Sequence, residues 1–139
     1  MVARALGIWC GELRRRGMPT LQTMREAAGD DLWPHHFTAD PPAEGIATTV
    51  RSDGGWLGAL TGIEAAGRGL EACAGPALWP AWSRAIGAVI ESRKPMPWVG
   101  RTCRVADRTI DVDVLFLPVD NGAADRTILL GFLKFHAVA

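Results

Sequence analysis

The alternation of apolar and polar residues is clearest in the last third of the chain, where it predicts strands. Between residues 108 and 117 the two kinds alternate with the period of two that a half-buried strand requires. Pro118 ends this run in our interpretation, and Asp120-Asn121-Gly122 supplies the residues of a turn. Residues 127–135 then carry apolar side chains on both parities, which is typical of a central strand covered on both faces.

Three further segments carry weaker strand patterns. Residues 98–105 are rich in strand formers and lead into the following strand through a short Ala106-Asp107 turn. Nearer the N-terminus, residues 32–39 predict another strand, which breaks at Asp40-Pro41-Pro42. Residues 45–50 predict its hairpin partner. The whole pattern therefore indicates about five antiparallel strands.

Apolar residues at helical spacing precede and separate these strands. Residues 6–13 predict a leading helix, which ends in three arginines and Gly17. Thr20 is the expected N-cap of a second helix that ends at Gly29.

The middle of the chain predicts two short helices and one long one. The short helices are expected around residues 56–60 and 70–73, and the long helix over residues 78–93. One apolar stripe runs along the long helix through Leu78, Trp82, Ala85, Ile86, Val89 and Ile90.

Composition and charge are those of an ordinary globular domain. The chain has 139 residues, 48% of them hydrophobic and 22% charged, and its 15 basic and 15 acidic residues cancel. A neutral balance provides no long-range field for nucleic acid or an anionic membrane, and no apolar run approaches the ~18 residues of a spanning helix. Three cysteines without a Cys-x-x-Cys pair favour a reducing compartment. We therefore expect a cytoplasmic protein without nucleic-acid or membrane partners.

The predicted order of two strands, short helices, one long helix and three strands is that of a PAS domain. A closer resemblance is carried by Trp9, Met18-Pro19, Leu32-Trp33-Pro34-His35, Gly54, Gly62, Gly67-Arg68, Leu70, Gly100-Arg101, Leu115-Phe116-Leu117-Pro118 and Ile128-Leu129-Leu130-Gly131. Together these residues resemble a PAS-like family of short stand-alone proteins in alphaproteobacteria, over nearly the whole chain. The chain departs from that family at Glu64, where Asp is usual. The resemblance implies a PAS-like fold and a sensory or regulatory role, and it transfers no catalytic residues.

We therefore expect a single PAS-like domain of the α+β class over residues 1–139. An antiparallel sheet of about five strands should be covered on one face by helices, with residues 127–135 in its centre. Residues 1–30 should form N-terminal flanking helices and residues 31–139 the PAS core. The leading helix should lie outside the core and form a homodimer through its stripe of Leu6, Trp9, Cys10 and Leu13.

One short motif resembles that of flavin-binding light sensors. Gly100-Arg-Thr-Cys-Arg-Val105 is similar to the Gly-Arg-Asn-Cys-Arg-Phe motif, whose cysteine adds to the flavin. Here the motif follows the long helix and leaves room for only two strands. The chain also has a single asparagine and a single glutamine with which to hold the polar edge of a flavin. We therefore interpret Cys103 as a half-buried strand residue.

Haem is the other chromophore to consider, since some PAS domains bind it through a helix histidine. The long helix contains no histidine. His35 and His36 are adjacent, so in a strand they point to opposite faces and only one can face a pocket. We interpret His35 as a hydrogen-bonding residue at the start of a strand. Haem and flavin stay remote alternatives, and we expect no cofactor.

Six tryptophans in a chain without tyrosine allow two interpretations. Tryptophans on the covering helices form either an aromatic wall for a flat ligand or, as we favour, core anchors between helix and sheet. Placing the helix stripe over the sheet gives a candidate ligand pocket lined by Trp56, Trp82, Ile86, Phe116, Phe132 and His35.

The sequence contains none of the common catalytic or nucleotide-binding motifs, such as the Gly-x-Ser-x-Gly elbow or the P-loop. No metal site is expected either, because Asp111 and Asp113 share a strand face without a further ligand nearby in sequence. We expect a colourless, non-catalytic sensory module that binds a small apolar ligand or signals through a partner protein. The alternative is a ligand-free adaptor for protein–protein contacts.

Overall fold

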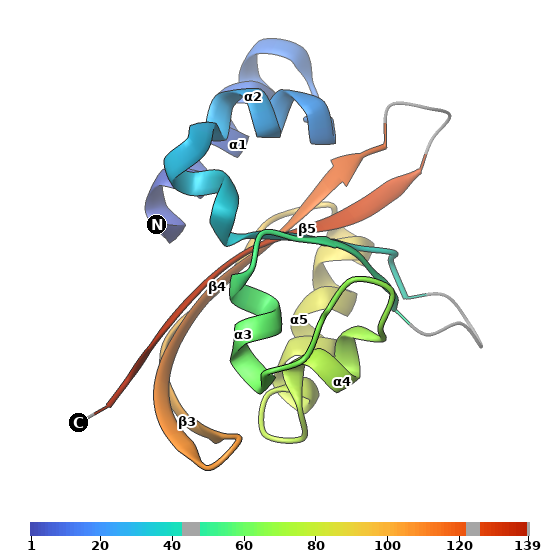
Figure 1. The fold of residues 1–139 in the computed structure, drawn as a ribbon. Helices are drawn as coiled ribbons and strands as arrows, with labels where there is room; N and C mark the ends of the chain where they lie inside the picture. The colour runs from blue at the N-terminus through green and yellow to red at the C-terminus, as the bar shows by residue number, and fades with distance from the viewer. Residues whose placement is uncertain (43–47, 122–125, 139) are drawn as a thin grey trace.

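The chain folds as an α+β protein in a computed structural model that describes residues 1–42, 48–121 and 126–138. The elements are α1 (Val2–Arg16), α2 (Leu21–Leu32), the 3-10 turn η1 (Trp33–His35), β1 (His36–Ala39), β2 (Val50–Asp53), α3 (Trp56–Thr61), α4 (Leu70–Ala74), α5 (Trp79–Ser92), β3 (Met96–Val105), β4 (Arg108–Asp120) and β5 (Thr127–Ala137). Within the described residues the strands form one antiparallel sheet of five, in the order β2-β1-β5-β4-β3 (Figure 1). The predicted fold class and the order of elements are confirmed.

The centre of the sheet is β5, as the apolar run at residues 127–135 predicts. This strand pairs with β1 on one side and with β4 on the other, both antiparallel. Gly131 of β5 lies opposite Phe37 of β1, whose ring covers it so closely that an added Cβ would sit 2.1 Å from the ring. A glycine is therefore required here by the close approach of an aromatic ring.

Two strand limits differ from the sequence-based expectation. Pro118 does not end β4, which continues to Asp120. The ladder with β3 reaches only Phe116, so Pro118 lies beyond the last pair on that side, where a strand tolerates proline. The strand expected at residues 45–50 is found at Val50–Asp53 instead, and residues 45–47 of that prediction lie outside the described residues.

The turn and cap residues act as expected in most places. Gly17 ends α1 with a φ of 84°. The side chain of Thr20 accepts a hydrogen bond from the backbone N–H of Thr23, which completes a capping box at the start of α2. Gly29, with a φ of 72°, bends α2 but does not end it, because the helix resumes as far as Leu32. The β3–β4 turn at Ala106-Asp107 has positive φ at both residues, as a type I′ hairpin requires.

Helices lie on both faces of the sheet. Figure 1 shows α3, α4 and α5 on one side and the N-terminal pair α1 and α2 on the other. Alternate side chains of β4 pack into two separate cores on opposite faces of the sheet. Val114 and Phe116 face α5, while Leu115 and Leu117 face α1 and α2. The expectation of helices on one face thus describes only the α3–α5 side.

The leading helix is part of the folded chain's own core, which differs from the expectation that it lies outside. The Trp9 side chain is 3% exposed, and its Nε1–H donates a hydrogen bond of 2.9 Å to the Pro118 carbonyl. Leu6 and Cys10 are partly buried against the same cluster, and Leu13 is 39% exposed. One side of the apolar stripe of α1 is therefore buried against the sheet of the same chain. This is possible because β4 carries apolar side chains on both faces beyond Val114.

No helix among the described residues is long and apolar enough to cross a membrane.

Replacing Gly131 with alanine should destabilise the protein by roughly 1–3 kcal/mol, because the fully buried Phe37 ring has no free space into which to move. Urea unfolding measures the change. The control is Gly87→Ala on α5, where a Cβ meets no atom within 4 Å. That substitution should raise stability by about 0.5–1 kcal/mol through helix propensity. Equal stability of wild type and Gly131→Ala would contradict the register of β1 on β5.

Candidate functional site

Three of the predicted pocket residues do come together, but they fill the space between them. Trp82, Ile86 and Phe116 are all at most 1% exposed and belong to one buried cluster. The Trp82 and Phe116 rings meet edge to face with centroids 5.5 Å apart, and the Phe37 ring lies parallel to Trp82 at 6.4 Å. These contacts are core packing, which is the interpretation that the sequence favoured for the tryptophans.

Trp56 and His35 form a separate pair nearer the surface. Their rings stack with centroids 4.7 Å apart, and the Trp56 ring also meets Phe135 edge to face at 5.3 Å. The His35 Nδ1–H donates to the Leu133 carbonyl at 2.9 Å. The interpretation of His35 as a hydrogen-bonding residue at the start of a strand is confirmed.

The placement of Phe132 on the α5 side of the sheet was wrong. Phe132 pairs with Leu115 rather than with Phe116, so it faces α1 and α2. Its ring lies 6.2 Å from that of Trp33, edge to face. Odd and even positions of β5 are both apolar, so the sequence did not show which of its side chains face α5 and which face α1 and α2.

Cys103 is a partly buried residue of β3 and pairs with Ile110 of β4. Burial raises the pKa of its thiol, and the Asp111 carboxylate acts in the same direction. The structure therefore confirms it as a half-buried strand residue, and the raised pKa favours the protonated thiol. Among the described residues, no three acidic, histidine or cysteine side chains are grouped as a metal site requires.

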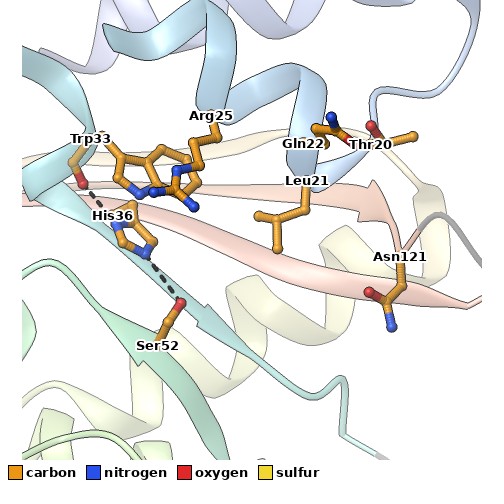
Figure 2. Close-up of a pocket in the computed structure, with 8 residues that line it drawn as sticks. All are labelled: Thr20, Leu21, Gln22, Arg25, Trp33, His36, Ser52 and Asn121. Atoms are coloured by element: carbon orange, nitrogen blue, oxygen red, sulfur yellow. Dashed lines mark hydrogen bonds between the residues drawn. The ribbon is translucent and has the colours of Figure 1, made fainter. Parts of the chain in front are cut away.

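A different cavity, of about 600 Å³, opens between α2 and the β1–β2 edge of the sheet (Figure 2). We call it the α2 cleft. Its lining comes from the start of α2, from η1, from β1 and β2 and from the end of β4. The residues are Thr20, Leu21, Gln22, Arg25, Trp33, His36, Ser52 and Asn121.

A stack of side chains forms one wall of the α2 cleft. The rings of Trp33 and His36 lie 3.9 Å apart and 14° from parallel. The guanidinium carbon of Arg25 lies 6.0 Å from the centroid of the Trp33 ring. In Figure 2 these three side chains come from α2, η1 and β1 and gather at one end of the cleft. They therefore connect the N-terminal helices to the sheet.

A directed chain of hydrogen bonds runs through His36. Its Nδ1 lies 2.7 Å from the Trp33 carbonyl, to which it must donate, and its Nε2 lies 3.1 Å from Ser52 Oγ. Burial lowers the pKa of His36, and the Arg25 charge lowers it further, against the opposing effects of the Trp33 carbonyl and Asp53. In the neutral ring Nε2 accepts a hydrogen bond from the Ser52 hydroxyl. The Thr38 hydroxyl, 2.6 Å from Ser52 Oγ, then donates to Ser52.

This chain of hydrogen bonds differs from that of a Ser-His-Asp triad. In that triad a carboxylate on the other histidine nitrogen orients the ring and stabilises the imidazolium. Here the Nδ1–H of His36 is held by the Trp33 backbone carbonyl, which fixes the ring and its tautomer. Ser52 and His36 therefore present fixed, uncharged polar groups to the cleft.

Sequence reasoning did not identify the α2 cleft. It recognised that His35 and His36 face opposite ways but chose His35 for the pocket. The Trp33-x-x-His36 spacing, with proline at the second position, was a signal for the tight turn that stacks these two rings. Nothing local in the sequence placed Arg25 or Ser52 beside them.

A comparison with models of known protein families finds no match to this chain, and a search of the curated proteins finds none either.

Acidification should destabilise the fold through His36. Its pKa is lower in the folded than in the unfolded chain, so the folded state binds the proton less well. The stabilisation is complete above the unfolded pKa of about 6.5 and is lost as the pH falls through the folded value. One proton gives a slope of at most about 1.4 kcal/mol per pH unit.

Urea unfolding between pH 7 and pH 5 measures this slope. The His36→Gln variant should show a smaller slope than wild type. An identical slope in His36→Gln and wild type would contradict a buried neutral His36.

Proposed function

We propose that the chain is a non-catalytic, cytoplasmic PAS-like regulatory module that senses a small molecule in the α2 cleft. The observation that carries the proposal is the cleft itself, about 600 Å³ in volume and lined by fixed polar and aromatic groups. Binding sites for small molecules generally have volumes of about 300–1,000 Å³ and combine apolar walls with a few placed polar groups.

The position of the cleft suggests how binding would become a signal. One side is built by α2 and η1, and the other by β1, β2 and the end of β4. A ligand that contacts both sides binds better when the N-terminal helices are docked on the sheet. Occupancy would then shift the population towards the docked arrangement, by as much as the two affinities differ.

The PAS-like part of the proposal is supported by the order of the elements and by the five-stranded antiparallel sheet. The sequence predicted a ligand site on the α3–α5 side of the sheet. We place the site on the α2 side instead, because Trp82, Ile86 and Phe116 pack against one another. The same packing favours the alternative function, a ligand-free adaptor that signals through a partner protein.

Native mass spectrometry of freshly purified protein, with an absorbance spectrum, tests the proposal. We expect a colourless protein that retains a small molecule or takes one up from a mixed metabolite library. Gln22→Trp, at an exposed residue on the cleft wall, should weaken that binding at least several-fold. The control Ala72→Trp lies in a separate hollow beside α4 and should leave it unchanged. Failure to bind any compound would favour the adaptor, and a persistent visible band would favour haem or flavin.

Homodimerisation through α1 is the second part of the proposal. With Trp9 packed on the sheet, the interface must use Leu13 and the partly buried Leu6 and Cys10. Leu13→Glu should shift the protein from dimer to monomer in sedimentation velocity at high micromolar concentration, because a charge would be buried in the interface. Val99→Glu, at an exposed apolar residue of β3, is the matched control and should leave the dimer intact. A monomeric wild type would rule this interface out.

A further inference from the structure

Arg25 is the one formally charged side chain among the described residues that line the α2 cleft. Its contact there is with the face of Trp33. No carboxylate in the described part of the chain lies within 4.0 Å of its guanidinium, whereas Arg51 and Arg93 each form an ion pair with an aspartate. The Arg25 guanidinium thus faces the cleft with hydrogen-bond donors to spare.

The carboxylates closest to this wall have other partners or lie outside the cleft. Asp53 accepts three backbone N–H groups at the start of α3, at 2.9–3.2 Å. Glu26 accepts a hydrogen bond from the side chain of Gln22 at 3.2 Å. Glu26 and Asp30 line an adjoining hollow that Arg25 and Trp33 also line, but neither carboxylate forms an ion pair with Arg25. Within the described residues the Arg25 guanidinium therefore forms no ion pair and is free to bind an anion in the cleft.

The other side chains that line the cleft are uncharged, and they provide both apolar surface and hydrogen-bonding groups. Leu21 and Trp33 supply apolar surface, while His36 and Ser52 present a hydrogen-bonded pair. Burial lowers the pKa of His36 and so favours the neutral ring, which adds no charge to the cleft. A ligand that matches this lining carries one negative group and a small apolar body.

We propose that the α2 cleft binds a small organic oxyanion, either a carboxylate or a phosphate ester on an apolar body, and that Arg25 selects for its negative charge. This inference deepens the proposed sensing function and rests on it. The planar guanidinium offers parallel N–H donors that match two oxygens of a carboxylate or phosphate. The apolar body would lie against Leu21 and Trp33, within the volume of about 600 Å³.

Four probes of related shape test the chemistry. Phenylacetate and phenyl phosphate carry the two oxyanions on the same ring, phenylacetamide is the neutral match, and inorganic phosphate is the head group alone. Calorimetric titration gives each dissociation constant. The indole N–H signal of Trp33, assigned with a Trp33→Phe variant, reports whether the probe enters the cleft. We expect at least one aromatic anion to bind and to shift this signal, at least ten-fold more tightly than phenylacetamide and inorganic phosphate.

Variants at Arg25 then test the assigned residue. Arg25→Gln should weaken binding of the aromatic anion about ten-fold or more, because a charge-assisted bidentate contact is lost. Arg25→Lys should retain part of the affinity, since it keeps the charge without the planar fork. Arg84→Gln, at an exposed arginine on α5, is the matched control and should bind as wild type does. Because Arg25 is exposed, loss of its contact with Trp33 should lower the melting temperature by only a few degrees, and the variants should stay folded.

The results that overturn this inference differ from those that overturn sensing. Phenylacetamide binding as tightly as phenylacetate, or Arg25→Gln binding as tightly as wild type, would reject oxyanion selection while leaving a ligand-binding cleft. Inorganic phosphate binding as tightly as phenyl phosphate would reject the apolar body. If no probe shifts the Trp33 signal, the oxyanion class is rejected, and the mixed library read by native mass spectrometry decides the sensing function separately.

Discussion

The structure depends on the burial of β5, together with the adjoining half of β4, on both faces of the sheet. Leu129 and Leu133 of β5 lie in the core under α3–α5, and Leu130 and Phe132 lie in the core under α1 and α2. A sheet that is apolar on both sides must be covered on both sides, and burial of apolar surface contributes about 25 cal/mol per Å². This requirement brings the N-terminal helices onto the sheet.

The α2 cleft follows from this arrangement, because the second layer covers only part of its face. The N-terminal pair lies over β4 and β5, and at the β1–β2 edge its cover gives way to a hollow. His36 is the residue that links the two parts there. It stacks on Trp33 from the helical side and hydrogen-bonds Ser52 from the sheet side. A ligand in the cleft would contact the same two parts that His36 connects.

The sequence predicted the sheet more completely than the site. The period-two pattern of β4, the continuous apolar run of β5 and the stripe on α5 located these elements because local spacing records which faces are buried. The β2 strand was misplaced because its polar residues, such as Arg51 and Ser52, carry little strand signal. The face of Phe132 and the burial of Trp9 depend on pairing across the sheet, which local spacing does not encode. The α2 cleft joins Arg25, His36 and Ser52 from three elements, so only the assembled chain brings them together.

The central claim is that the cleft lies between two parts of the chain that can separate, and native-state hydrogen exchange tests it most directly. Local unfolding exposes amides at a lower free energy than global unfolding does. In the ligand-free protein we expect the amides of α1 and α2 to exchange at a clearly lower free energy than those of Leu129–Leu133 in β5. If the helix amides instead exchange only together with β5, through global unfolding, the two parts do not separate and a ligand between them could not act by shifting their population.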